Sequence, residues 1–67
     1  MELRRILARN VKRLRKLRDW TQEDLEAAAK VDRGSISAVE NSKCSTGIDI
    51  IERLASGLGV EPTDLLK

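Results

Sequence analysis

Lys and Arg side chains are the chemically distinctive groups in this sequence, and they are concentrated near its start. Residues 1–18 carry eight basic side chains and one acid, whereas residues 19–67 carry five basic and ten acidic side chains. A basic helix of this kind can bind a phosphate backbone or an anionic membrane surface. The plainer alternative is a solvated helix face, and charge alone favours that alternative.

The groups that most enzymes require are missing from the sequence. It contains no His, no nucleophile–base pair, no set of metal ligands and no glycine-rich phosphate loop. The single cysteine, Cys44, has no partner for an internal disulfide. We therefore expect a protein that is not an enzyme, with no cofactor, no metal and no small-molecule substrate.

The hydrophobic residues do not form a membrane segment or a leader. No run approaches the roughly 18 uncharged apolar residues of a membrane helix. Arg4, Arg5 and Arg9 interrupt the apolar runs at the N-terminus, so no signal peptide is expected. The sequence predicts a cytoplasmic protein without a membrane partner.

The spacing of the aliphatic residues predicts an all-α fold. Leu, Ile, Val and Ala recur at intervals of three and four, and the chain of 67 residues is long enough for one domain, residues 1–67. The predicted helices cover about residues 2–18, 21–29, 32–41, 47–57 and 62–66. In the first helix the apolar stripe consists of Leu3, Ile6, Leu7, Val11, Leu14 and Leu17.

The second helix has a clear start signal. Thr21 is a good N-cap, and Asp24 three residues later completes a capping pair. Trp20 is placed to pack on Leu25 as a hydrophobic staple, which gives this tryptophan a sufficient structural role.

A tight turn at Lys30-Val31 must separate the second helix from the third, because Asp32 is already the next N-cap candidate. Ile36 and Val39 then face inward. The opposite face is small and polar and suits close approach to another surface, or water equally well. It consists of Arg33, Gly34, Ser37, Ala38 and Asn41.

The remaining elements follow a loop at residues 42–47. Thr46 and Asp49 form a second predicted capping pair, and Gly57 and Gly59 mark the end of the helix that follows. Pro62 suits the first turn of a last short helix. The predicted buried residues of the fourth helix are Ile48, Ile51, Leu54, Ala55 and Leu58.

Several motifs in order resemble one known family. "WTQEDL", "VDRGSIS" followed by "VEN", and "IDIIERLASGLGVEPTDLL" are similar to the phage repressor/Cro (XRE-like) helix-turn-helix family, especially to restriction–modification controller proteins. The resemblance covers about residues 9–66. It implies a compact five-helix bundle of the lambda-repressor type, in which residues 32–41 enter the major groove of DNA.

The resemblance also implies roles for particular residues. The base-reading positions are Arg33, Gly34, Ser35, Ser37 and Ala38. The phosphate-contacting positions are Gln22, Asn41 and Lys43. Arg15 and Glu40 match a buried ion pair between the first and third helices, although spacing alone leaves open that they are unrelated surface charges. Among the base-reading positions only Arg33 has the donors to bind guanine O6 and N7 together.

Some residues depart from the family pattern. Glu26 replaces an alanine between the two motif helices, where an unpaired carboxylate must reach solvent, find a cation or push the helices apart. Lys30 replaces the turn glycine, and Ser42 and Thr46 replace a glycine and a proline of the following loop. Ser35 stands where the controller proteins usually carry tyrosine.

The sequence therefore supports two functions. The first is a transcriptional regulator, with repression and activation both open, that binds double-stranded DNA as a homodimer on a palindromic operator. The second is a protein-interaction or antitoxin-like module that keeps the fold with weakened DNA binding. The departures at Glu26, Lys30 and Ser35 favour the second.

Overall fold

Four α-helices and one 3₁₀ helix follow one another along the chain. The computed structural model describes residues 2–43 and 46–67. The elements are α1 (Glu2–Leu17), α2 (Gln22–Ala29), α3 (Arg33–Glu40), α4 (Ile48–Leu58) and the 3₁₀ helix η1 (Pro62–Leu66). The all-α prediction is confirmed, but the predicted count of five α-helices is wrong because the last element is a single 3₁₀ segment.

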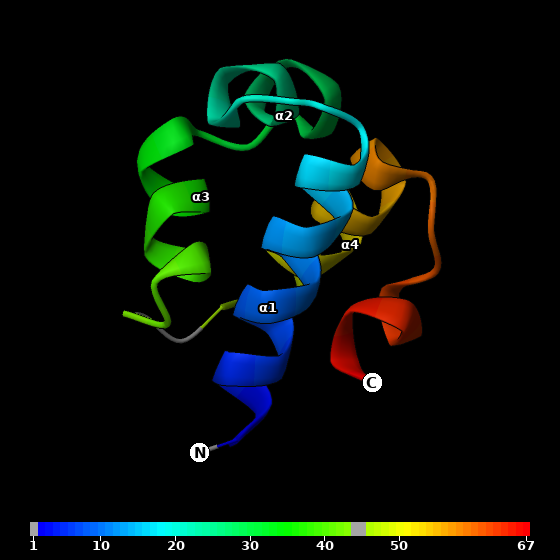
Figure 1. Ribbon diagram of the computed structural model, residues 1–67. Coiled ribbons are helices and arrows are strands. Elements are labelled where there is room, and N and C mark those ends of the chain that lie inside the picture. The colour runs from blue at the N-terminus through cyan, green and yellow to red at the C-terminus, as the bar shows by residue number, and fades with distance from the viewer. Residues whose placement is uncertain (1, 44–45) are drawn as a thin grey trace.

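The helices surround one core, with α1 at the centre of the view in Figure 1. α3 lies on one side of α1 and η1 on the other, α2 crosses the top, and α4 lies behind. α2 contacts both α3 and α4. The buried core consists of Leu7, Val11, Leu25, Ala29, Val31, Ile36, Val39, Leu54, Ala55, Leu58 and Leu65. None of the helices in the described part of the chain is long and apolar enough to span a bilayer.

The apolar stripe predicted for α1 is buried only in its middle. Leu7 and Val11 lie in the core, but Leu17 is 71% exposed and Leu3 is 43% exposed. The chain leaves the helix after Leu17 and turns through Asp19, which has a left-handed backbone (φ 59°). After this turn Trp20 packs against the core and is partly buried.

α2 and α4 approach each other at a glycine. A Cβ atom built on Gly57 would lie 2.7 Å from the Cα of Ala29, too close for any residue larger than glycine. Gly57 is therefore part of the helix interior, and the prediction that it marks the helix end is wrong. The end is at Gly59, whose left-handed φ of 71° fits the prediction made for it.

The start of α4 differs from its prediction. Gly47 is the N-cap and makes no side-chain hydrogen bond, so the predicted Thr46–Asp49 capping pair is wrong. Ile48, predicted to be buried, is 76% exposed because the first turn of α4 extends beyond the core. Residues 44 and 45 of the predicted 42–47 loop lie outside the described residues.

The C-terminal segment is held against α1 by a buried amide. Leu65 in η1 is fully buried, and Asn10 in α1 is 3% exposed. The Asn10 Nδ2 group donates to the carbonyl oxygens of Leu65 (2.9 Å) and Lys67 (3.1 Å). Since a buried amide without partners is costly, these bonds fix the last residues against the first helix.

Candidate nucleic-acid interface

α2 and α3 are joined by a turn of three residues, as the sequence predicts. The N-cap Thr21 accepts from Asp24 N (3.1 Å) while Asp24 Oδ2 accepts from Thr21 N (2.9 Å), so the predicted capping pair is confirmed. α2 ends at Lys30, which has φ 58° and ψ 40° in the left-handed region, and Val31 after it is buried. Asp32 then caps α3 by accepting from Ser35 N at 3.2 Å.

Glu26 connects the two motif helices. Its Oε2 atom accepts a hydrogen bond from the backbone N–H of Arg33 at 3.0 Å. That N–H is the first of α3 and has no partner within its own helix, and a negative charge is favourable at a helix N-terminus. Glu26 is only half-buried and this contact is exposed, so the carboxylate reaches solvent, which is one of the three expected outcomes, and it also accepts the Arg33 N–H. The sequence gives no signal for it, because the contact depends on how α2 and α3 cross.

The outward face of α3 is small and polar. Ile36 and Val39 are buried on the inner side, as predicted, while Arg33 and Gly34 are exposed and Ser35, Ser37 and Ala38 are half-buried. A Cβ on Gly34 would lie 2.8 Å from Asp32 Oδ2, so this glycine also leaves room for the cap.

Arg33 has an acidic partner that sequence reasoning missed. Its Nη1 lies 2.8 Å from Glu23 Oε2 in α2, with the two side chains 59% and 62% exposed. Hydrogen bonds from the backbone N–H of Glu23 and from the Arg33 guanidinium hold the pKa of Glu23 below its ordinary value. An ion pair this exposed adds little to stability, so another anion can displace the carboxylate.

The segment after α3 presents an exposed cation. Asn41 is the C-cap, and its Nδ2 donates to Ser37 O (2.8 Å) and Ser37 Oγ (3.3 Å). Ser42 adopts a left-handed φ of 58° where the family has glycine. Lys43 is exposed, and its backbone N–H donates to Ala38 O at 2.9 Å, which fixes the position of its main chain.

Arg15 and Glu40 form the ion pair expected between α1 and α3. The contact is bidentate, with Arg15 Nε 2.7 Å from Glu40 Oε2 and Arg15 Nη2 3.0 Å from Glu40 Oε1. The side chains are 12% and 2% exposed, and Arg15 Nη1 also donates to Trp20 O at 2.7 Å. A planar guanidinium with three satisfied bonds is well suited to this position.

Gln22 is the third member of this network. Its Nε2 donates to Glu40 Oε1 at 3.2 Å, so the side chain expected to meet phosphate points toward α3 in the free protein. Burial alone would raise the pKa of Glu40, but hydrogen bonds from Arg15 and Gln22 and the charges of Arg15 and Lys12 outweigh burial and lower it. Glu40 is therefore a buried carboxylate that stays ionised.

Comparison with known proteins connects this geometry to a family. Residues 11–65 match the helix-turn-helix family model. The chain is 37% identical over 65 residues to a hypothetical transcription factor of Neisseria meningitidis, covering 97% of this chain but only 61% of the relative. An uncharacterized HTH-type transcriptional regulator of Sinorhizobium fredii is 29% identical over 66 residues, with 98% of this chain and 86% of the relative covered.

Two solved structures share the fold. The crystal structure of the Neisseria factor superposes with a TM-score of 0.91, covering 97% of this chain and 75% of that chain at 37% identity. The restriction–modification controller protein C.AhdI of Aeromonas hydrophila gives a TM-score of 0.84 at 27% identity, with 90% and 91% of the two chains covered. This chain is therefore a member of the helix-turn-helix family.

Proposed function

We propose that the protein is a sequence-specific, double-stranded-DNA-binding transcriptional regulator, with α3 as its recognition helix. The observation that carries the proposal is the outward face of α3, which is exposed or half-buried along its length and free of bulky apolar side chains. A face of this kind can approach the floor of the major groove closely. The names of the two curated relatives, a transcription factor and a transcriptional regulator, agree with it.

The proposed roles divide into readout and positioning. Arg33 reads guanine through its guanidinium, and it reaches the base by exchanging Glu23 for the acceptors of that base. The other base-facing positions are Gly34, Ser35, Ser37 and Ala38. Asn41 and Lys43 at the end of α3 and Gln22 at the start of α2 hold phosphates, where the backbone N–H groups of a helix N-terminus assist.

The alternative function loses part of its support. Glu26 was one of three departures, with Lys30 and Ser35, that favoured a module with weakened DNA binding, and an unpaired carboxylate there could have pushed α2 and α3 apart. Its hydrogen bond to Arg33 N instead ties these helices together. The small Ser35 still leaves less groove contact than a tyrosine would make.

The test compares Arg33→Ala with Lys43→Ala. Duplexes are first selected from random DNA, and affinities are then measured on the selected site and on unrelated DNA. Arg33→Ala should weaken binding to the selected site by about 1–3 kcal/mol and should change the affinity for unrelated DNA little. Lys43→Ala should weaken both and reduce the slope of log affinity against log salt by about one. Equal effects of the two substitutions on every DNA would contradict groove reading.

We also propose that the protein binds as a dimer to a palindromic operator. Two copies of α3 must lie about 34 Å apart to enter successive major grooves on one side of the duplex. Selected sites should therefore contain inverted repeats whose centres are about one helical turn apart.

A further inference from the structure

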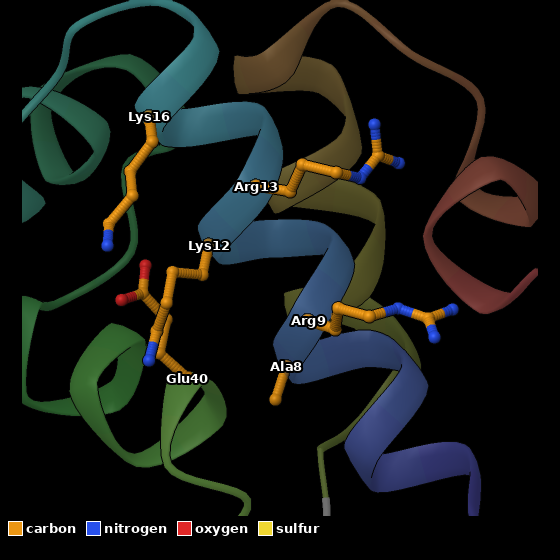
Figure 2. A pocket seen from close by; sticks show the side chains of 6 residues that line it. All are labelled: Ala8, Arg9, Lys12, Arg13, Lys16 and Glu40. Atoms are coloured by element: carbon orange, nitrogen blue, oxygen red, sulfur yellow. The ribbon is translucent and has the colours of Figure 1, made fainter.

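One face of α1 carries a row of cations that the helix-turn-helix does not use. Arg9, Lys12, Arg13 and Lys16 line a groove of about 410 Å³, with Ala8 and Glu40 completing its lining. Their spacing of three and four residues places the backbone positions of all four on one broad face of the helix, from which the side chains can extend to either side. Figure 2 shows this groove from close by.

The four cations divide into two pairs with different surroundings. Lys12 and Lys16 extend toward α3, whereas Arg9 and Arg13 extend to the opposite side of α1 (Figure 2). The two arginines have structural partners, since Arg9 Nη2 donates to Lys67 O and Arg13 Nη2 donates to Asn10 Oδ1, each at 3.3 Å. Within residues 2–43 and 46–67, the side chains of Lys12 and Lys16 have no hydrogen-bond or salt-bridge partner.

Glu40 does not cancel the charge of the two lysines. Both of its oxygens are occupied by Arg15 and Gln22, and its side chain is only 2% exposed. The paired Arg15 and Glu40 are together neutral, so the positive charges of Lys12 and Lys16 remain available to an external anion. Lys12 also lies close enough to Glu40 to lower the pKa of that carboxyl, which places this lysine at the α1–α3 junction.

The arrangement favours an extended polyanion over a small one. Lys12 and Lys16 are one helical turn apart, about 6 Å along α1 at 1.5 Å per residue. This distance is close to two nucleotide steps of a DNA strand, at roughly 3.4 Å each. A single phosphate cannot contact all four cations, because the two pairs point away from each other. A membrane surface is disfavoured because the one apolar residue that lines the groove, Ala8, is only 5% exposed, so the groove offers no apolar side chain to insert among lipid chains.

We propose that Lys12 and Lys16 form a second phosphate-binding surface, which binds the sugar–phosphate backbone of the same duplex that α3 reads. This inference rests on the proposed function. α1 packs directly on α3, and the lysines extend from α1 toward that helix. The surface lengthens the DNA footprint beyond the two motif helices and adds affinity that does not depend on sequence.

The experiment compares two double variants of equal charge. Lys12→Gln/Lys16→Gln removes the proposed surface. Lys30→Gln/Arg53→Gln removes two exposed cations beside the α2–α4 contact, where no DNA contact is proposed. Affinity for one mixed-sequence duplex is measured over a range of salt concentrations, and thermal unfolding confirms that both variants are folded.

The Lys12/Lys16 variant should reduce the slope of log affinity against log salt by about 1.8, because each phosphate contact contributes roughly 0.9. The control variant should keep the wild-type slope. If the two double variants lower the slope equally, only net charge matters and the inference is overturned. Groove reading is then still tested independently by comparing Arg33→Ala with Lys43→Ala.

Two further outcomes also count against the surface. Wild-type protein that binds no duplex at all contradicts both this inference and the proposed function. Vesicles containing phosphatidylserine provide the second comparison. If the Lys12/Lys16 variant loses vesicle binding but keeps the wild-type salt slope on DNA, the surface serves lipid and the inference is wrong.

Discussion

Glu40 shows how a single buried carboxylate joins three parts of the protein. It lies at the end of α3 and accepts hydrogen bonds from Arg15 in α1 and Gln22 in α2. Its folded-state pKa lies below the ordinary value. A carboxylate with a lowered folded pKa stabilises the fold at any pH above its unfolded pKa of about 4.3, and that stabilisation is lost as the pH falls through the folded pKa.

Glu40→Gln should therefore destabilise the protein most at neutral pH. The substitution leaves the Arg15 guanidinium buried without its anion, which costs about 3–5 kcal/mol for pairs of this kind. In acid, wild-type Glu40 becomes protonated and the difference between the two proteins should shrink. Urea unfolding at neutral and acidic pH measures both values. A difference that does not change with pH would show that the charge of Glu40 is irrelevant to stability.

A double-mutant cycle provides the control. Glu40→Gln combined with Arg15→Met should cost much less than the sum of the two single substitutions, because neither charge is then left unpaired. Effects below 1 kcal/mol that simply add would contradict a buried pair. The lowered pKa values of Glu23 and Asp64 also make wild-type stability fall in acid. The contribution of Glu40 is therefore the difference in unfolding free energy between wild type and variant at each pH, and not the loss of wild-type stability alone.

At the scale of residues, the sequence indicates which residues have structural roles better than it indicates which side chains contact one another. Arg15 and Glu40 are 25 positions apart, and it was resemblance to a family, not spacing, that paired them. The contacts of Glu23 with the Arg33 guanidinium and of Glu26 with the Arg33 N–H were not predicted. Both depend on the crossing of α2 over α3, a geometry that no local pattern encodes.

At the scale of elements, all four α-helices are followed by a residue with a left-handed backbone. These residues are Asp19, Lys30, Ser42 and Gly59. Only the last is glycine, the residue that adopts this conformation without steric cost. The sequence therefore indicates the end of α4 more directly than the other three.

Lys30→Gly should stabilise the protein by up to about 1 kcal/mol. The left-handed conformation at Lys30 is strained for a residue with a Cβ, and glycine removes this strain. The gain should exceed the cost of the greater backbone freedom that glycine gives the unfolded chain. The midpoint of thermal unfolding measures the change. Lys30→Ala is the matched control, since it removes the same charge but keeps the Cβ, and it should not stabilise. If glycine proves clearly destabilising, the turn after α2 is not left-handed in solution.

The other element predictions fail where a tertiary contact replaces a local rule. Gly57 has the residue type of a helix stop, but glycine is required there because a Cβ atom would lie 2.7 Å from the Cα of Ala29 in α2. Thr46 and Asp49 have the spacing of a capping pair, yet the N-cap is Gly47, one residue later, and α4 begins at Ile48. Periodicity places the helices correctly, and the errors lie at their ends, where the core stops.

At the scale of the whole molecule, the monomer uses part of the surface expected for dimerisation. The sequence favours the apolar residues near Val60, Leu65 and Leu66, with part of α4, as the surface for a second copy, or else as residues that only close the small core. Leu65 is fully buried in the monomer, so it is unavailable to a partner. Val60 and Leu66 are half-buried against the core, which leaves Ile48 of α4 as the most exposed large apolar side chain.

Ile48→Asp should weaken self-association without lowering monomer stability, because the side chain is 76% exposed before any partner binds. Sedimentation equilibrium, with and without DNA, measures the change. Leu17→Asp is the matched control. Leu17 is similarly exposed (71%), but it lies on α1, outside the proposed partner surface, so its substitution should not affect dimerisation. A wild-type protein that stays monomeric at every concentration, on DNA and off it, would contradict a palindromic operator.

The bond between Asn10 and the C-terminal carbonyls has a consequence for synthesis on the ribosome. α1 is made first, but the groups that satisfy its buried amide belong to Leu65 and Lys67. Until residues 62–67 emerge from the exit tunnel, α1 lacks both the Leu65 side chain and the acceptors for Asn10. The nascent chain therefore cannot complete its core until those residues have emerged, and its folding becomes cooperative only from that point.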